Sequence, residues 1–397
     1  MPRLCTFLAW TLAVAAAAGC ASQKKGRRNA RAVDWESEEY QTQTASLTNV
    51  SAHPEAPMAW HPASAVNNSL GLSNRLAVLT GTNVHDGWIP LSRWCTAQHL
   101  PMPSRISADG PTAYGLRTTN GTMLLSPGTR IATWEGLEFR LGFKPAIIHS
   151  ELCVQGLDLE KTVEPLIGDE LPALGKSNPV IVIDPGHGGE NAGAPSIDGK
   201  HYEKEFTLDW ALRLAPLLQT NGWTVFLTRT NDTDLALSNR VNFAEAHKAD
   251  IFLSLHFNSA GTDASQRGLE TYCLTPMGMS STVTRGFGDD LTLSFANNAF
   301  DAQNLVLAAR VHRALRGAGI RDRGVRRARF PGVLRGQQRP AILIEGGYIS
   351  NREEASLISQ GSHREKLAEA VAAALRVPAR SPTQLSQGSG PGNQQSK

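Results

Sequence analysis

Apolar and polar positions follow two different patterns along the second half of the chain. Short runs of apolar and β-branched residues are bounded by glycine, proline or polar turns, which is typical of buried strands. Between them lie longer segments in which apolar residues recur every three or four positions, as on the buried side of a helix. Strands are expected at 180–183, 224–228, 251–256, 269–274 and 341–345, and helices at 205–219, 236–247, 301–316 and 362–375.

This alternation of strands and helices predicts an α/β domain over residues 178–376, in which a mostly parallel or mixed central sheet is flanked by helices. Local capping signals agree with the expected helix ends. Asn221 and Gly222 follow the first helix as a typical C-terminal cap. Asp232 and Asp234 precede the second helix, where a carboxylate can accept hydrogen bonds from the first backbone N–H groups.

Residues 75–167 show a different pattern, in which short strand-like runs are separated by glycine, proline and asparagine turns. Asn120 and Gly121 lie between two such runs, and this dipeptide favours a hairpin turn. The spacing predicts a small, mostly-β domain in front of the α/β domain. The histidines of this domain are scattered and form no cluster at ligand spacing: His85, His99 and His149.

Residues 1–20 have the organisation of an export signal. A short positive region with Arg3 precedes an apolar, alanine-rich stretch that is too short to span a bilayer comfortably. The segment ends in Ala-Ala-Gly-Cys, which resembles the cleavage site of bacterial lipoproteins and predicts that Cys20 becomes the lipidated N-terminus. An ordinary signal peptide, cut near Ala18 or Ala21, is the alternative. Both place the protein in the cell envelope or periplasm, and the first favours an outer-membrane lipoprotein.

Two further stretches lack the periodicity of a folded segment. Residues 21–74 are polar and charged, and residues 377–397 are rich in proline, serine, glutamine and glycine. Segments of such composition cannot bury enough apolar surface to offset the conformational entropy lost on folding. The sequence therefore predicts a disordered linker behind the signal segment and a disordered tail at the end of the chain.

Charge and cysteine content narrow the class of protein. The 397 residues carry a formal net charge of +3, so the chain lacks the strongly basic character of a nucleic-acid-binding protein. Cys95, Cys153 and Cys273 follow the signal segment, and their odd number leaves at least one unpaired in an oxidising compartment. A disulfide between Cys95 and Cys153 and a pair of buried free thiols both remain open.

Four side chains suited to metal binding or acid–base chemistry lie near the ends of the expected elements. His187 follows the first strand on a glycine-rich turn, and Glu203 stands at the entry to the first helix. His256 and Glu345 each end an apolar strand. Because open α/β sheets bind their ligands at the carboxyl ends of strands, the fold can bring these groups to one edge. Two histidines and a carboxylate form the ligand set of catalytic zinc, and the remaining glutamate is a candidate general base.

Five sequence blocks carry a specific resemblance, and in order they are DPGHGGENAGA, YEKEFTLDWALRL, VFLTRTNDTDLALSNRVNFAEAHKADIFLSLHFNSA, RGLETY and RPAILIEGGYISNREE. From about residue 180 to residue 375, the chain resembles the zinc-dependent N-acetylmuramoyl-L-alanine amidases of bacterial cell-wall turnover. This resemblance implies that His187, Glu203 and His256 bind Zn²⁺. It also implies that Glu345 is the catalytic glutamate.

The resemblance further implies a reaction. Zinc would activate water for attack on the amide between N-acetylmuramic acid and L-alanine in peptidoglycan, and Glu345 would carry the proton to the leaving amine. Such a hydrolase would act in cell-wall remodelling or daughter-cell separation, held at a membrane through a lipid anchor at Cys20. An activator protein is a candidate partner, and nucleic acid is not. Another zinc peptidase or deacylase, and a cell-wall-binding protein without catalysis, are the alternatives.

The small β-rich domain carries a second resemblance. Its runs WIPLSRW, LGF followed by proline, and LDLEKTVEPLIG resemble the domain first named from the N-terminus of copper amine oxidases. The name of that domain does not imply copper. Binding to cell-wall polymer and service as a passive spacer are both open as its role.

Three more features each have a structural and a functional interpretation. Residues 275–303 form a long connection, either a surface insertion near the cleft or a lid over the zinc. The basic run 320–329 is either a solvated face or part of a groove that binds the carboxylates of stem peptides. Arg229 and Arg240 are expected to brace loops, and Asn258 to support a histidine ligand or the substrate.

Overall fold

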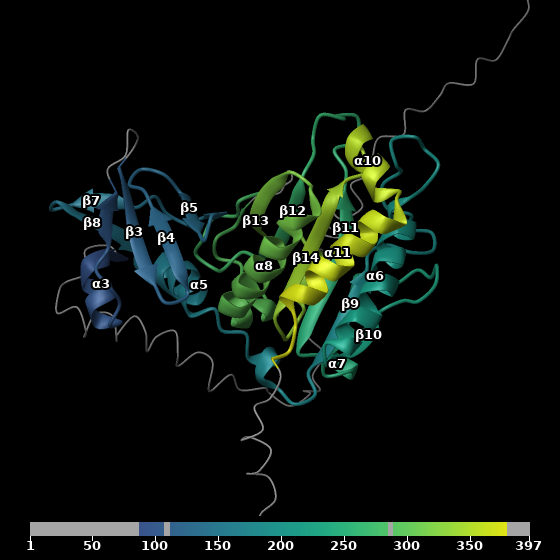
Figure 1. The fold of residues 1–397 in the computed structure, drawn as a ribbon, viewed down its shortest axis with the longest axis horizontal. Helices are drawn as coiled ribbons and strands as arrows, with labels where there is room; N and C mark the ends of the chain where they lie inside the picture. Colours follow the sequence, from purple (N-terminus) through teal and green to yellow (C-terminus); the bar gives the residue numbers. More distant parts are fainter. Residues whose placement is uncertain (1–86, 107–111, 285–288, 379–397) are drawn as a thin grey trace, which may run out of the picture. The chain divides into compact units, whose positions relative to one another are not determined.

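The structure is a computed structural model, and it describes residues 87–106, 112–284 and 289–378. It confirms the predicted class: a six-stranded mixed sheet with helices on both faces follows a small β-rich region (Figure 1). No helix among the described residues is both long and apolar enough to cross a bilayer. Several predictions fall outside the described residues, namely those for 1–20 with Cys20, for 21–74, for His85 and for the tail beyond residue 378.

The central sheet has the strand order β10-β9-β11-β14-β12-β13. The first four strands are parallel, β12 is antiparallel to β14, and β13 is parallel to β12. The five predicted strands are all present, within a few residues of their expected ends. In sheet order, the strands are Thr224–Leu227, Val180–Pro185, Ile251–Asn258, Ala341–Tyr348, Leu269–Leu274 and Asp322–Ala328.

One strand of this sheet was not predicted. β13 contains three arginines and an aspartate, so its sequence lacks the apolar run of a buried strand. It occupies the edge of the sheet next to β12, and its charged side chains pair with two buried residues, Glu270 of β12 and His312 of α8 (Asp301–Leu315). Ion pairing therefore replaces apolar burial in this element, and the pattern of apolar residues gives no signal for it.

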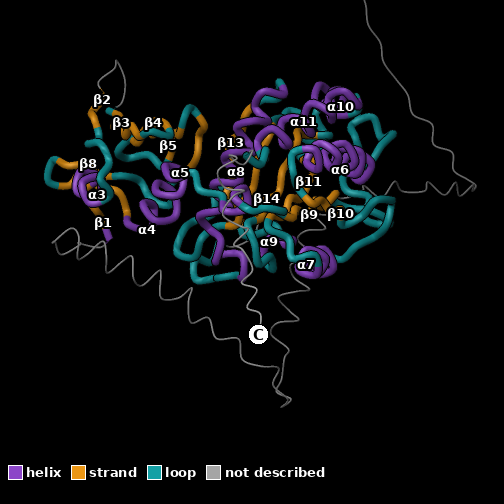
Figure 2. Tube along the Cα trace, turned by 60° about the horizontal axis from the view of Figure 1, so that its bottom comes forward, coloured by secondary structure: helices purple, strands orange, loops and turns teal. Residues whose placement is uncertain are grey.

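Helices cover the two faces of the sheet unequally. α6, α8 and α11 pack on one face, and the short α9 with α7 packs on the other (Figures 1 and 2). Alternate strand residues divide between these faces: Ile181 and Ile183 join the first layer, and Val182 joins the second. The helix bounds are Glu203–Thr220 for α6, Leu237–Ala246 for α7, Asp301–Leu315 for α8, Gly332–Arg335 for α9, Arg352–Ile358 for α10 and Gly361–Ala374 for α11.

The four predicted helices correspond to α6, α7, α8 and α11, whereas α9 and α10 are additional short elements. Asn221 caps the C-terminal end of α6, and Gly222 follows with φ 95°, as expected. The capping prediction for α7 is wrong, because its N-cap is Ala236 and carries no side-chain cap. Asp232 instead accepts hydrogen bonds from the Gly189 N–H and from the Lys204 ammonium group.

The β-rich region contains two antiparallel sheets. One has the order β1-β8-β7 and the other β2-β3-β4-β5-β6. The predicted hairpin joins β3 to β4, with Thr118 paired to Gly121, so the turn lies one residue earlier than the Asn-Gly pair indicates. The bounds are Trp88–Pro90, Ser104–Ile106, Ala113–Thr118, Gly121–Leu125, Ile131–Trp134, Leu137–Arg140, Ala146–Ile148 and Glu151–Gln155 for β1 to β8. Helical segments in this region are Leu91–Ala97 (α3), Gly156–Asp158 (α4), the π-helix Leu159–Val163 and Glu164–Gly168 (α5).

Cys95, Cys153 and Cys273 are all buried free thiols, so the Cys95–Cys153 disulfide is not formed. Burial raises the pKa of the Cys95 and Cys273 thiols to about 11. A thiol with so high a pKa carries little thiolate at neutral pH, and thiolate is the reactive form. These cysteines are therefore packing residues.

Candidate metal centre

The first candidate ligand lies on a turn that glycine makes possible. β9 ends at Pro185, and the chain passes through Gly186 to His187, whose φ of 62° lies in the left-handed region. Residues with a Cβ atom adopt this region rarely, and tertiary contacts must hold them there. At Gly186, a Cβ atom would lie 2.3 Å from the ring of His256. The turn thus brings the backbone beside one candidate ligand against the side chain of another.

Two buried arginines hold this turn in place. Arg240 donates to the Asp184 carboxylate at 2.7 Å and to the backbone carbonyl oxygen of His187 at 2.9 Å. Arg229 donates to two further carbonyl oxygens of the turn, at 3.0 and 2.8 Å. Burial acts to raise the pKa of Asp184, but Arg240 and neighbouring hydroxyl donors outweigh it and hold the pKa below its ordinary value. These contacts match the bracing role expected for both arginines.

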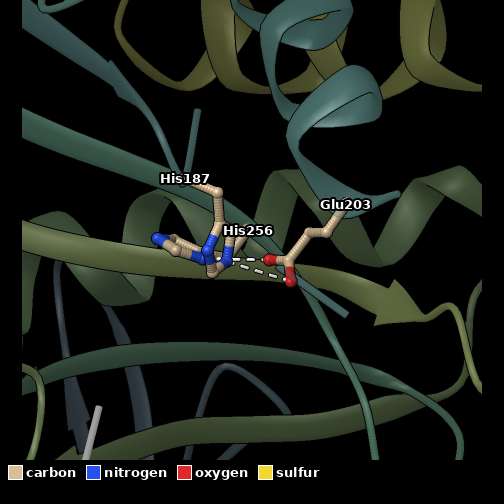
Figure 3. A group of neighbouring side chains, drawn as sticks. All are labelled: His187, Glu203 and His256. Carbon is tan, nitrogen blue, oxygen red and sulfur yellow. Dashed lines mark hydrogen bonds and ion pairs between the residues drawn. The ribbon is translucent and has the colours of Figure 1, made fainter. Parts of the chain in front are cut away.

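His187, Glu203 and His256 come together from the turn after β9, the first residue of α6, and β11 (Figure 3). His187 Nε2 lies 3.0 Å from Glu203 Oε2, and His256 Nδ1 lies 3.0 Å from Glu203 Oε1. The three side chains are at most 7% exposed. One ligand atom from each residue lies within 4.8 Å of the others. Three of the four predicted site residues therefore share one buried cluster.

The surroundings of Glu203 favour its ionised form. Burial acts to raise its pKa, but His187 and His256 outweigh this effect, so the pKa lies well below its ordinary value. The Phe257 N–H donates to Oε1 at 3.0 Å. On the other side of the cluster, Nδ1 of His187 lies 2.8 Å from the amide oxygen of Asn191. Because that oxygen can only accept, Nδ1 carries the ring proton and Nε2 is the nitrogen that faces the cluster.

The three residues fit a zinc ion. Two imidazole nitrogens and a carboxylate oxygen are the donors of catalytic zinc sites that keep a fourth position for water. The backbone also fits closely, because a Cβ atom at Gly193 would lie 2.7 Å from side-chain atoms of both His187 and Glu203. Among the described residues, no other group of histidine, cysteine and acidic side chains meets the same criterion. The ligand role of the three residues remains a prediction, which this geometry supports.

Glu345 lies on the strand next to His256. The two residues are register partners in the parallel pair β11 and β14, so their side chains leave the same face of the sheet, with the strands about 4.8 Å apart. Glu345 is 5% exposed. The sequence predicted that this strand ends at Glu345. β14 instead continues through two glycines to Tyr348. The fourth predicted residue is thus a neighbour of the cluster and separate from its ligand set.

The part of the chain that holds this cluster matches known proteins. A family model described as N-acetylmuramoyl-L-alanine amidase matches residues 181–377. N-acetylmuramoyl-L-alanine amidase LytC of Bacillus subtilis is 36% identical over 202 residues, which cover 50% of this chain and 35% of LytC. The probable cell wall amidase LytH of Staphylococcus aureus is 32% identical over 207 residues, which cover 52% of this chain and 59% of LytH.

A solved structure shows sequence similarity over the same half. The catalytic domain of CwlV, an N-acetylmuramoyl-L-alanine amidase of Bacillus (Paenibacillus) polymyxa, is 33% identical, with a TM-score of 0.41, and the match covers 50% of this chain and 96% of that domain. Residues 181–377 belong to the N-acetylmuramoyl-L-alanine amidase family. They form the amidase region of the chain. The chain spans only part of the length of these curated relatives, 35% of LytC and 59% of LytH.

The structure adds one acidic residue of the amidase region that sequence reasoning missed. Glu270 lies directly opposite Glu345 in the antiparallel pair β12 and β14 and is 2% exposed. Asn258 donates to Glu270 Oε2 at 3.0 Å, so this asparagine contacts the buried acid. A charged residue inside the apolar strand LETYCL was the available signal. A buried carboxylate needs partners, and the sequence does not show where they come from.

The lid interpretation of residues 275–303 is wrong for the described residues of that segment. β12 runs antiparallel to β14, so its first residues lie beside Glu345 and its last residues lie beside the start of β14. The segment therefore leaves the sheet beside the N-terminal end of β14, whereas the metal cluster lies at the carboxyl ends of the parallel strands. The segment stays at that N-terminal end, because Asn297 donates to the carbonyl oxygen of Arg339, just before β14, at 2.8 Å. The direction of one strand decides this point.

The basic run 320–329 is not a solvated face. It contains the whole of β13, and Arg327 and Arg329 are only 4% and 6% exposed. Arg329 donates to the carbonyl oxygens of Pro276 and Met279 at 2.9 and 2.8 Å. Arg323 and Arg326 both pair with Glu270. Two arginines of the run thus lie at the same edge of the sheet as Glu345.

Gly186→Ala tests the packing of the turn against His256. Because the new Cβ atom would lie 2.3 Å from the ring, His256 must move, and we expect zinc affinity to fall about 10- to 100-fold, as it does when a ligand's support is lost. Competition with a chelating dye would measure this affinity. Gly175→Ala is the matched control, since nothing lies within 4 Å of its added Cβ atom. Equal zinc affinity in both variants would contradict the expected collision.

Proposed function

We propose that the protein is a zinc-dependent N-acetylmuramoyl-L-alanine amidase that hydrolyses peptidoglycan. The observation that carries this proposal is the buried cluster of His187, Glu203 and His256, with Glu345 on the adjacent strand, inside a region that belongs to the amidase family. The named relatives support it, because LytC and CwlV are themselves described as N-acetylmuramoyl-L-alanine amidases.

Each residue of the site has a distinct part in this proposal. His187, Glu203 and His256 would hold Zn²⁺, which supplies a Lewis acid that polarises the scissile carbonyl group and lowers the pKa of water. Glu345 lies outside the ligand set, so its carboxylate can take the proton of the attacking water and pass it to the amine that leaves. The low exposure of all four side chains excludes bulk water and strengthens these electrostatic interactions.

The place of this reaction in the cell is a prediction from the sequence. Export, lipid attachment at Cys20 and a role in wall remodelling or daughter-cell separation rest on residues 1–20 and on the family, as does an activator partner. If Cys20 is acylated, the charged segment 21–74 would place the amidase region at some distance from the membrane.

Digestion of purified peptidoglycan by the full chain tests the proposal. We expect release of intact stem peptides that begin with a free L-alanine amine. Treatment with a chelator should abolish this release, because the proposed reaction depends on the zinc ion that the three ligands hold. Mass spectrometry of the soluble products would show which bond is cut. Cleavage within the peptide or at an acyl group would favour another zinc hydrolase, and binding without any product would favour a wall-binding protein.

A further inference from the structure

Glu270 organises a cluster of cations and hydroxyl groups beside Glu345. Its Oε1 accepts from Arg323 Nε at 3.0 Å and from Arg326 Nε at 3.2 Å. Its Oε2 accepts from three further donors: Asn258 Nδ2 at 3.0 Å, the Tyr272 hydroxyl at 3.0 Å and the Tyr348 hydroxyl at 3.3 Å. Burial acts to raise the pKa of Glu270, but the two arginines outweigh it and keep this carboxyl ionised. The cluster therefore carries one negative and two positive charges.

The two arginines differ in how much of each guanidinium group is engaged. Arg323 also donates to Gln266 Oε1 at 3.2 Å and lies over the ring of Tyr348, 5.3 Å from its centroid. Arg326 is held through Nε alone: in the described part of the chain, Glu270 is the one acceptor recorded for its side chain. Its side chain is 16% exposed. The two terminal nitrogens of Arg326 thus form a fork that can take a ligand.

The strand register places this fork on the reaction side of the sheet. Glu270 is the antiparallel partner of Glu345, so the two side chains leave the same face. Arg326 is the register partner of Tyr272, two residues beyond Glu270 and on that same face. β13 lies two strand spacings from β14, about 10 Å. Since Arg326 reaches back to Glu270, its guanidinium group lies within roughly that distance of Glu345.

We propose that the guanidinium fork of Arg326, positioned by Glu270 beside Glu345, binds a free carboxylate on the second or third residue of the stem peptide. This inference rests on the proposed amidase function, because Glu345 marks the position of the scissile amide. An extended peptide spans about 3.3–3.6 Å per residue, so two or three residues cover the separation. Arginine presents a planar pair of donors that matches a carboxylate. Arg323 and Arg326 share the single carboxylate of Glu270, so that carboxylate compensates their two charges only in part.

A pair of substrates tests this inference in a single enzyme preparation. Both are synthetic N-acetylmuramoyl peptides; one carries a free carboxylate on its second residue, and the other carries a carboxamide there. We expect the full-length wild-type protein with zinc to cleave the carboxylate form with a kcat/KM at least about tenfold higher, as for a charge-assisted hydrogen bond. In Arg326→Gln, this ratio should fall to about one. Because both substrates meet the same protein, a change in folding or zinc content cancels in the ratio.

Arg376→Gln is the matched control. Arg376 is exposed and follows α11 beside Trp223, whose indole N–H donates to Leu375, at the opposite edge of the sheet. Arg376→Gln removes the same charge as Arg326→Gln but far from Glu270. Its ratio of kcat/KM for the two substrates should therefore equal that of the wild type. Equal cleavage of both substrates by the wild type would overturn the inference and leave the amidase function intact. The same loss of ratio in Arg376→Gln would overturn it as well, by showing a general effect of charge.

Binding to the chelator-treated protein gives a second measure that does not depend on turnover. The probes are the two alanyl peptides that the reaction would release, again as carboxylate and carboxamide. By calorimetry, we expect the wild type to bind the carboxylate peptide about tenfold more tightly than the carboxamide peptide. Arg326→Gln should bind the two peptides with equal affinity. If neither substrate is cleaved but this preference is present, the carboxylate subsite stands and the proposed reaction fails. If the preference is absent, the inference is wrong.

Discussion

Glu345→Gln should lower kcat for peptidoglycan hydrolysis by about 10²- to 10⁴-fold, the range typical for loss of a general acid–base group. Glutamine keeps the size of the side chain but cannot take up a proton from water at neutral pH. Its position supports the proposed role as proton carrier, because Glu345 is the register partner of His256 on the neighbouring strand and lies outside the proposed ligand set. Release of soluble stem peptide per unit time would measure the effect.

Two comparisons separate a catalytic effect from a structural one. The zinc content of Glu345→Gln should equal that of the wild type, because His187, Glu203 and His256 are unchanged. Glu353→Gln is the matched control: Glu353 has a side chain that is 76% exposed and pairs with Arg267. It should digest peptidoglycan as fast as the wild type. Wild-type activity in Glu345→Gln would show that another group moves the proton.

Apolar periodicity predicted the elements that bury ordinary hydrophobic faces. β9, β11 and β14 are rich in Ile, Leu and Val, and their residues fill both sides of the sheet. Since His187, His256 and Glu345 follow such runs, the strand pattern and the parallel order of the sheet suffice to bring them to one edge. Glu203 is different, because its position depends on where α6 begins, and local sequence indicates such a boundary only within a few residues.

The parts of the fold that the sequence pattern did not predict depend on contacts between segments far apart in the chain. β13 has an edge position and carries Arg323 and Arg326, whose common partner is Glu270, more than fifty residues earlier. No local pattern connects these residues, so the sequence left both a solvated face and a carboxylate-binding groove open for the basic run. The position of residues 275–303 likewise depends on the direction of β12, which runs antiparallel to β14. The periodicity of apolar residues in a strand does not encode that direction. Register and strand direction are properties of the assembled sheet.

Glu203→Ala should abolish zinc binding at micromolar metal, with a loss of affinity of at least about 1,000-fold. The expected loss exceeds the 10- to 100-fold effect typical of residues that only support a ligand, because the substitution removes a proposed direct ligand together with its negative charge. In the wild type, zinc at 100 times its dissociation constant should stabilise the folded state by about 2.7 kcal/mol. For a region of this size that corresponds to a rise in Tm of about 5–10 °C. Thermal melts with and without zinc would measure it.

Glu205→Ala provides the control for this experiment, since Glu205 also lies in the first turn of α6 but pairs with the exposed His201. It should retain both the zinc-dependent rise in Tm and peptidoglycan hydrolysis. Glu203→Ala should show no rise in Tm with zinc, and it should also lose activity. Its melting temperature without metal is a separate matter, because the substitution removes a buried carboxylate that faces two imidazoles. A zinc-dependent rise of normal size in Glu203→Ala would place the metal elsewhere.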